Sequence, residues 1–253
     1  MDWVDQADRF WAGELSVAPH VLRADGFRVF ERADADTQLR ATIVGTSSAT
    51  IVSLPEGRTH TFEDAGLSLE QMRRAPRRYV ASCASIQTLE VRGPALLAYW
   101  PPSTPSPIPC AQTSPLGVDG LAPLTSLRET APAEWEEAGI GPNSRVFGLH
   151  LDDRLVAVAG YERWSDQIAQ LQVFCHPDYR RRGLAAEPLK AATSHAMADN
   201  LLPQYRARDG NKASIALAKR VGFVEYGWMA TVLVRLPNSA VQRTGAPDAR
   251  PGG

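Results

Sequence analysis

The stretch LQVFCHPDYRRRGLA, residues 171–185, decides how the rest of the sequence is interpreted. It passes from an apolar run through a proline turn into a basic, glycine-containing segment that opens a helix. The N-terminus of a helix offers backbone N–H groups without intrahelical partners, and the helix dipole adds partial positive charge there. Arg180, Arg181 and Arg182 add charge at that point, and Gly183 allows close approach to the backbone. The stretch therefore predicts an anion site that suits phosphate oxygens.

Alternating strands and helices are expected on both sides of this stretch, and short polar connections in front of it predict antiparallel hairpins. The expected strands are residues 146–150, 155–161, 168–175, 202–207 and 226–236. The expected helices are residues 125–138, 184–199 and 212–220. Pro188 fits the second of these helices only if that helix starts late or bends, because proline lacks an N–H and crowds the preceding turn.

The proline run PPSTPSPIP, residues 101–109, is the clearest break between predicted helices and strands and favours extended backbone. We place a linker there, between an N-terminal α/β domain at 1–100 and a second domain at 110–236, and expect a disordered tail at 237–253. In the N-terminal domain the expected strands are 27–32, 41–45, 49–54 and 95–100. The expected helices there are 2–15 and 68–75, the second opened by Ser68 and stopped before Pro76.

Charge and cysteine content exclude several classes of function. The chain of 253 residues has 27 basic and 28 acidic side chains, which argues against a nucleic acid or a membrane surface as partner. Cys83, Cys110 and Cys175 are far apart and lie in no CxxC motif, so neither a disulfide framework nor a metal site is expected. The N-terminal residues do not have the pattern of a secretory signal, and we expect a cytoplasmic protein.

Two motifs resemble those of the GNAT N-acetyltransferase superfamily. The family pattern Arg/Gln-x-x-Gly-x-Gly/Ala is matched by Arg180, Gly183 and Ala185, with a strand before it and a helix after it. Downstream, GNKASIALAKRVGFVEYG, residues 210–227, is similar to the family's second motif through Asn211, Ser214, Gly222 and Phe223. The resemblance covers about residues 110 to 236.

The resemblance implies a mixed α/β (α+β) fold with a mostly antiparallel sheet flanked by helices. The N-terminal domain is compatible with a diverged copy of that fold. The resemblance also implies acetyl-coenzyme A (acetyl-CoA) as cofactor, with pantetheine along the backbone of the strand that ends at Cys175 and pyrophosphate on the loop before the helix. The residues assigned to the cofactor are Val173, Phe174, Cys175, Arg180, Arg181, Arg182, Gly183, Leu184, Ala185, Asn211 and Ser214.

The family's usual chemistry is direct attack of a primary amine on the thioester, which needs a base because a free amine has a pKa of about 10.4. Glu162, at the end of the strand at 155–161, is our candidate, although a Glu beside Arg163 is also typical of an exposed ion pair. Asp166 is the next candidate. Cys175 is expected to be a strand side chain and not a nucleophile, because no paired histidine is evident.

One position departs from the family pattern, because many members place a tyrosine where this chain has Ala218. That tyrosine can protonate the leaving thiolate, and Tyr205 and Tyr226 are the substitutes to consider. A non-catalytic sensor or binding module for acyl-coenzyme A is therefore the alternative to an N-acetyltransferase. The acceptor would be a small-molecule or peptide amine, and the N-terminal domain would cover the acceptor cleft or form a subunit interface, as in a homodimer.

Overall fold

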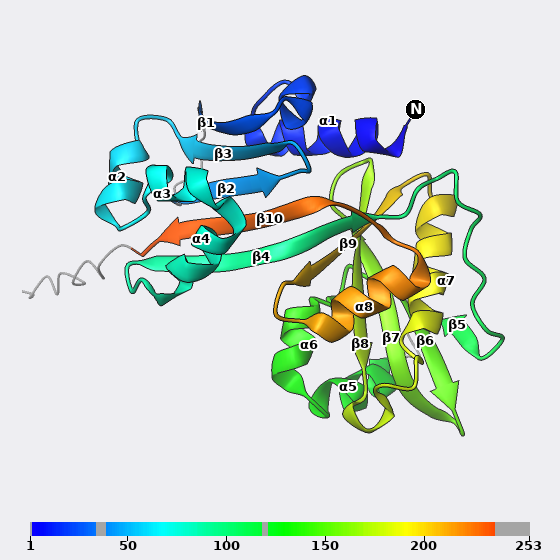
Figure 1. The fold of residues 1–253 in the computed structure, drawn as a ribbon. Coiled ribbons are helices and arrows are strands. Elements are labelled where there is room, and N and C mark those ends of the chain that lie inside the picture. Colours follow the sequence, from blue (N-terminus) through cyan, green and yellow to red (C-terminus); the bar gives the residue numbers. More distant parts are fainter. Residues whose placement is uncertain (1, 34–38, 118–120, 236–253) are drawn as a thin grey trace, which may run out of the picture.

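The computed structural model describes residues 2–33, 39–117 and 121–235, and its strands form one ten-stranded sheet (Figure 1). The strand order is β1-β3-β2-β10-β4-β9-β8-β7-β6-β5. The bounds are β1 Gly26–Arg32, β2 Arg40–Gly45, β3 Ala49–Pro55, β4 Leu89–Tyr99, β5 Thr113–Pro115, β6 Arg145–Leu151, β7 Arg154–Arg163, β8 Ile168–Cys175, β9 Leu202–Arg208 and β10 Val224–Val234. Only the β1–β3 and β8–β9 pairings are parallel within the described residues, so the expected α/β fold with a mostly antiparallel sheet is confirmed.

Helices cover both faces of the sheet. One face carries α1 (Trp3–Leu15), η1 (Pro19–Arg23), α5 (Leu121–Glu129) and α6 (Pro132–Ala138). The other carries α2 (Thr59–Asp64), α3 (Leu69–Arg74), α4 (Pro76–Ser82), η2 (Cys83–Ser85), α7 (Ala186–Ala198) and α8 (Lys212–Val221). The short helix η4 (Pro177–Tyr179) follows β8. No helix in these described ranges is long and apolar enough to cross a bilayer.

Strands β4 and β10 run through the middle of the sheet and join its two ends (Figure 1). β4 lies between β9 and β10, and β10 pairs with β2 on its other side. Alternate side chains of β4 enter different cores: Leu97 and Tyr99 pack under α1, whereas Leu96 and Trp100 join the cluster under α7 and α8. The division into two domains with a linker at 101–109 stays a prediction. β4, which belongs to the expected N-terminal domain, lies between two strands of the expected second domain.

Local capping explains where the helices begin. The Asp2 side chain accepts from the N–H of Val4 and starts α1, and Ser68 accepts from Gln71 and starts α3. α7 starts at Ala186, which places Pro188 in the first turn, where a missing N–H breaks no intrahelical bond. The late start that Pro188 required is therefore confirmed. Pro76 does end α3, but it also opens α4, a helix that the sequence did not predict.

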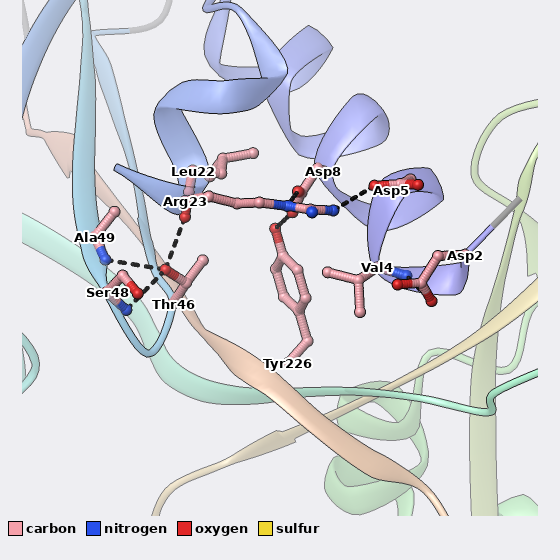
Figure 2. A network of polar contacts seen from close by, with 10 residues as sticks. All are labelled: Asp2, Val4, Asp5, Asp8, Leu22, Arg23, Thr46, Ser48, Ala49 and Tyr226. Atoms are coloured by element: carbon pink, nitrogen blue, oxygen red, sulfur yellow. Dashed lines mark hydrogen bonds and ion pairs between the residues drawn. The ribbon is translucent and has the colours of Figure 1, made fainter. Parts of the chain in front are cut away.

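A polar network that is buried at Asp8 and reaches the surface at Arg23 connects α1 with the sheet (Figure 2). Asp8, 3% exposed, accepts from Tyr226 of β10 at 2.8 Å and pairs with Arg23 of η1. Arg23 also pairs with Asp5, one turn earlier on α1. Thr46, after β2, donates from Oγ1 to the carbonyl of Leu22 at 2.9 Å. These bonds tie the first helix to the last strand.

Candidate active site

Strands β8 and β9 are paired at one end and part at the other. Their parallel ladder runs from the Ile168–Leu202 pair to the Gln170–Gln204 pair and stops there. Beyond this point β8 stays paired with β7 as far as Cys175, while β9 stays paired with β4 as far as Arg208. The two strands therefore separate inside a continuous sheet and leave an opening between them.

The edge of β8 in this opening carries backbone groups that no described strand pairs with. The expected pantetheine residues Val173, Phe174 and Cys175 lie on this edge, opposite the free part of β9. An extended ligand that contains amide groups can bond such an edge as an added strand would. Burial raises the pKa of the Cys175 thiol, which leaves it a poor nucleophile, as expected for a strand side chain.

The loop between β8 and α7 presents a row of free donors. In the described part of the chain, the backbone N–H groups of residues 181–185 donate to no carbonyl. Arg181 and Gly183 have φ values of 62° and 78°, so the loop contains two left-handed residues before α7 begins. Free N–H groups at the start of a long helix form an anion site, and they fit the pyrophosphate of a coenzyme A.

The arginines around this loop have different partners. Arg180 bonds the Cys175 carbonyl at 3.1 Å and pairs with Glu134 of α6 at 2.9 Å, so it braces the loop. Arg182 lies over the Tyr179 ring at 5.4 Å. Arg220, at the end of α8, was not predicted, yet a Cβ on Gly183 would lie 2.7 Å from its Nη1. Only the fold brings Arg220 to this loop, and a phosphate bound there would meet its guanidinium.

The second motif caps α8. Asn211 accepts from the N–H of Ser214 at 3.0 Å, and the Ser214 hydroxyl is 2.8 Å from that of Tyr205 on β9. Tyr205 is 1% exposed and packs in the cluster that also holds Leu171 and Ala218. Burial raises the pKa of Tyr205 to about 12, so its hydroxyl stays protonated at neutral pH. Tyr205 therefore lies beside the opening, whereas Tyr226 points to Asp8 under α1 (Figure 2).

A row of hydrogen-bonded side chains crosses the face of the sheet under α1, formed by Trp11, Tyr99, Gln204 and Gln170. The Trp11 indole donates to the Tyr99 hydroxyl at 2.8 Å, and Tyr99 donates to the Gln204 side-chain oxygen. Gln204 donates to Gln170 at 2.8 Å, and Gln170 donates to the Leu171 carbonyl at 2.9 Å. This chain of bonds ends where β8 and β9 part. No local pattern in the sequence predicts this chain of bonds, because its members come from four separate segments.

Glu162 extends this row on β7, directly across from Gln170. Its neighbour Arg163 bonds Asp199 of α7 at 3.3 Å, on the other face of the sheet. The Glu162 side chain has no hydrogen bond or ion pair to any residue that the structure describes. Asp166 lies exposed in the hairpin turn between β7 and β8, at the paired end of the strands and away from the opening.

Comparison with known proteins identifies this architecture. The acetyltransferase (GNAT) family model matches residues 119–223, a range that contains the strand opening, the donor-lined loop and α8. Residues 119–223 form a GNAT domain. The expected family resemblance of the C-terminal half is thus confirmed, and β4 supplies this GNAT domain with a strand from outside the matched range.

Comparison with solved structures found GNAT-family proteins that are similar to part of this chain. A GNAT-family protein from Novosphingobium aromaticivorans is 25% identical, covers 60% of this chain and 69% of its own, and has a TM-score of 0.47. A GNAT acetyltransferase from Colwellia psychrerythraea is 18% identical, with coverage of 73% and 76% and a TM-score of 0.49. No curated protein matches the sequence. Within the described residues, no group of three or more His, Cys, Asp or Glu side chains is arranged to hold a metal ion.

Proposed function

We propose that the protein is an acetyl-CoA-dependent N-acetyltransferase that acts on a primary amine. The observation that carries this proposal is the strand opening, which leads directly to the free N–H groups of residues 181–185 at the start of α7. Val173–Cys175 would bind the pantetheine arm, and Arg181–Ala185 with Arg220 would hold the phosphates. The thioester would then lie near Leu171, where β8 and β9 meet.

Glu162 is proposed as the base on the α1 face of the opening. The amine must lose a proton to attack, and a carboxylate without a cation partner can take it directly or through one water molecule. The new bond joins the amine nitrogen to the carbonyl carbon, and the bond between that carbon and sulfur breaks. Proton transfer to Glu162 leaves the amide neutral, and the departing thiolate needs a proton or nearby positive charge.

Replacing Glu162 with Gln should lower kcat by roughly 10²–10⁴-fold, because general-base catalysis contributes about that much. Release of free coenzyme A over a panel of amines measures this effect, and calorimetry should show almost unchanged acetyl-CoA binding. Asp166→Asn is the matched control, since Asp166 lies away from the opening, and it should retain full activity. Equal turnover by Glu162→Gln and the parent protein would remove Glu162 from the mechanism.

Tyr205 is proposed as the proton donor to the thiolate, in place of the tyrosine that Ala218 replaces. Tyr205→Phe should lower kcat by about 10–100-fold, in the lower range for general acids, with acetyl-CoA affinity changed less than about threefold. Tyr226→Phe makes the same chemical change at a buried tyrosine under α1 and should leave kcat unchanged. If both variants are fully active at equal melting temperature, the thiolate leaves without help from Tyr205.

The rival function is a non-catalytic sensor of acyl-coenzyme A, which Ala218, 0% exposed in the core, favours because it carries no acid group. A sensor would bind acetyl-CoA without releasing coenzyme A for any amine tested. The thiol-release assay therefore separates the two functions. Absence of saturable acetyl-CoA binding would contradict both.

A further inference from the structure

Arg206 is a charged residue on the part of β9 that borders the opening. It lies two residues beyond Gln204, where the β8–β9 ladder ends, and strand alternation puts both side chains on one face. Along this face Leu202 packs in the core under α1, and Arg208 pairs with Glu137 of α6 at 3.2 Å. Arg206 therefore lies between the parts of β9 that α1 and α6 contact.

The surroundings of Arg206 are aromatic. Its guanidinium carbon is 4.2 Å from the centre of the Trp164 ring, and Trp164 stacks on Phe10 of α1 at 5.8 Å. Within the described residues the side chain of Arg206 has no hydrogen bond and no ion pair. Burial lowers the pKa of Arg206 to about 10, so it remains charged at neutral pH.

A largely buried cation without a carboxylate is unfavourable unless something compensates its charge. The guanidinium has N–H donors in a planar fork, and one aromatic face satisfies none of them by a hydrogen bond. In the described part of the chain, the only fully enclosed side-chain nitrogen or oxygen without a partner is Nε1 of Trp100. The guanidinium nitrogens of Arg206 are not among the enclosed atoms, so water or a small ligand can reach them.

We infer that Arg206 binds a carboxylate of the amine acceptor. The acceptors would then be small amino acids with a free carboxylate. This inference rests on the proposed function. One guanidinium suits one carboxylate, because it can bond both oxygens and neutralise a single charge. A dianionic phosphate would need a second cation, but the neighbouring Arg208 is already paired with Glu137.

The arrangement of charge on this face fits such an acceptor. Glu162 on β7 and Arg206 on β9 lie on either side of Gln170 in β8, all on the face toward α1. A zwitterion could direct its ammonium group toward Glu162 and its carboxylate toward Arg206. The amine would then lie over the end of the β8–β9 ladder, close to the proposed place of the thioester.

Matched pairs of acceptors test the inference directly. Glycine and glycinamide, β-alanine and its amide, and phenylalanine and its amide differ only in the carboxylate, and phosphoethanolamine with ethanolamine forms the phosphate arm. We expect kcat/KM to be at least about tenfold higher for the carboxylate member of the best pair. Equal use of both members, or a preference for amides or phosphoethanolamine, would overturn the assignment.

Variants show whether Arg206 is responsible for this preference. Arg206→Gln should remove the preference by raising KM for the carboxylates at least about tenfold, while the amides change less than about threefold. Acetyl-CoA binding should be unchanged. Arg208→Gln, on the same strand and face, should keep the preference. If Arg206→Gln retains it, another group binds the carboxylate and the inference is wrong.

A binding measurement separates failure of this inference from failure of the proposed function. Calorimetry of the full chain with coenzyme A, titrated with N-acetyl amino acids and their amides, requires no turnover. Stronger binding of the acids that disappears in Arg206→Gln supports the carboxylate site even if no amine releases coenzyme A. Equal binding of acids and amides, or no binding of either, would overturn it even if other amines are acetylated.

Discussion

A fragment of residues 110–253 is expected to lack a cooperative unfolding transition, although it contains the whole family match. Without β4, strands β9 and β10 lose the neighbour that lies between them. The core under α7 and α8 also loses Leu96 and Trp100, which are 3% and 4% exposed. Removing two such side chains costs roughly 5–10 kcal/mol, comparable with the entire stability of a typical domain.

Circular dichroism and thermal unfolding of the fragment measure this effect against the full chain. Supplying residues 1–109 as a second polypeptide should restore a folded complex, because β4 can then occupy its place between β9 and β10. A fragment that unfolds cooperatively within about 5 °C of the full chain would contradict the prediction. In that case the boundary at residues 101–109 would separate two independent domains.

Gly183→Val is expected to weaken acetyl-CoA binding by at least about 100-fold. The φ of 78° is unfavourable for a β-branched residue, and a Cβ would lie 2.7 Å from Nη1 of Arg220. Relief of both conflicts would turn the N–H groups of the loop away from the pyrophosphate. Loss of two charge-assisted hydrogen bonds, worth about 1.5–3 kcal/mol each, accounts for a change of this size.

Calorimetry with acetyl-CoA measures the affinity, and Gly57→Val is the matched control. Gly57 has a φ of 66° in the turn after β3, and a Cβ there would meet no atom within 4 Å. It therefore carries a similar backbone strain away from the cofactor loop. Arg220→Gln keeps the loop glycine and should weaken binding about fivefold through one lost phosphate contact. Unchanged affinity in both Gly183→Val and Arg220→Gln would exclude this loop as the phosphate site.

Most of the secondary structure could be predicted because its signals are local. The hairpins β6–β7 and β7–β8 follow from apolar runs with short polar turns, and Asp2, Ser68 and Gly139 mark helix ends by their capping chemistry. The donor-lined loop could also be predicted, because strand, loop and helix are consecutive. α2 and α4 were missed because both are short and neither begins with a side-chain cap, whereas the equally short α3 is marked by Ser68.

The sequence by itself thus predicted the GNAT motifs, the basic loop before α7 and the need for a late start or a bend in the helix that contains Pro188. Tertiary structure alone decided that β4 completes the GNAT sheet and that Arg163 bonds Asp199 on the face away from Glu162. It also decided that Arg206 lies over Trp164 and pairs with no carboxylate of the residues described. The physical reason is the range of the contacts. Caps, turns and helix N-termini depend on neighbours within a few residues, whereas strand order and unpaired charges depend on segments far apart in the chain.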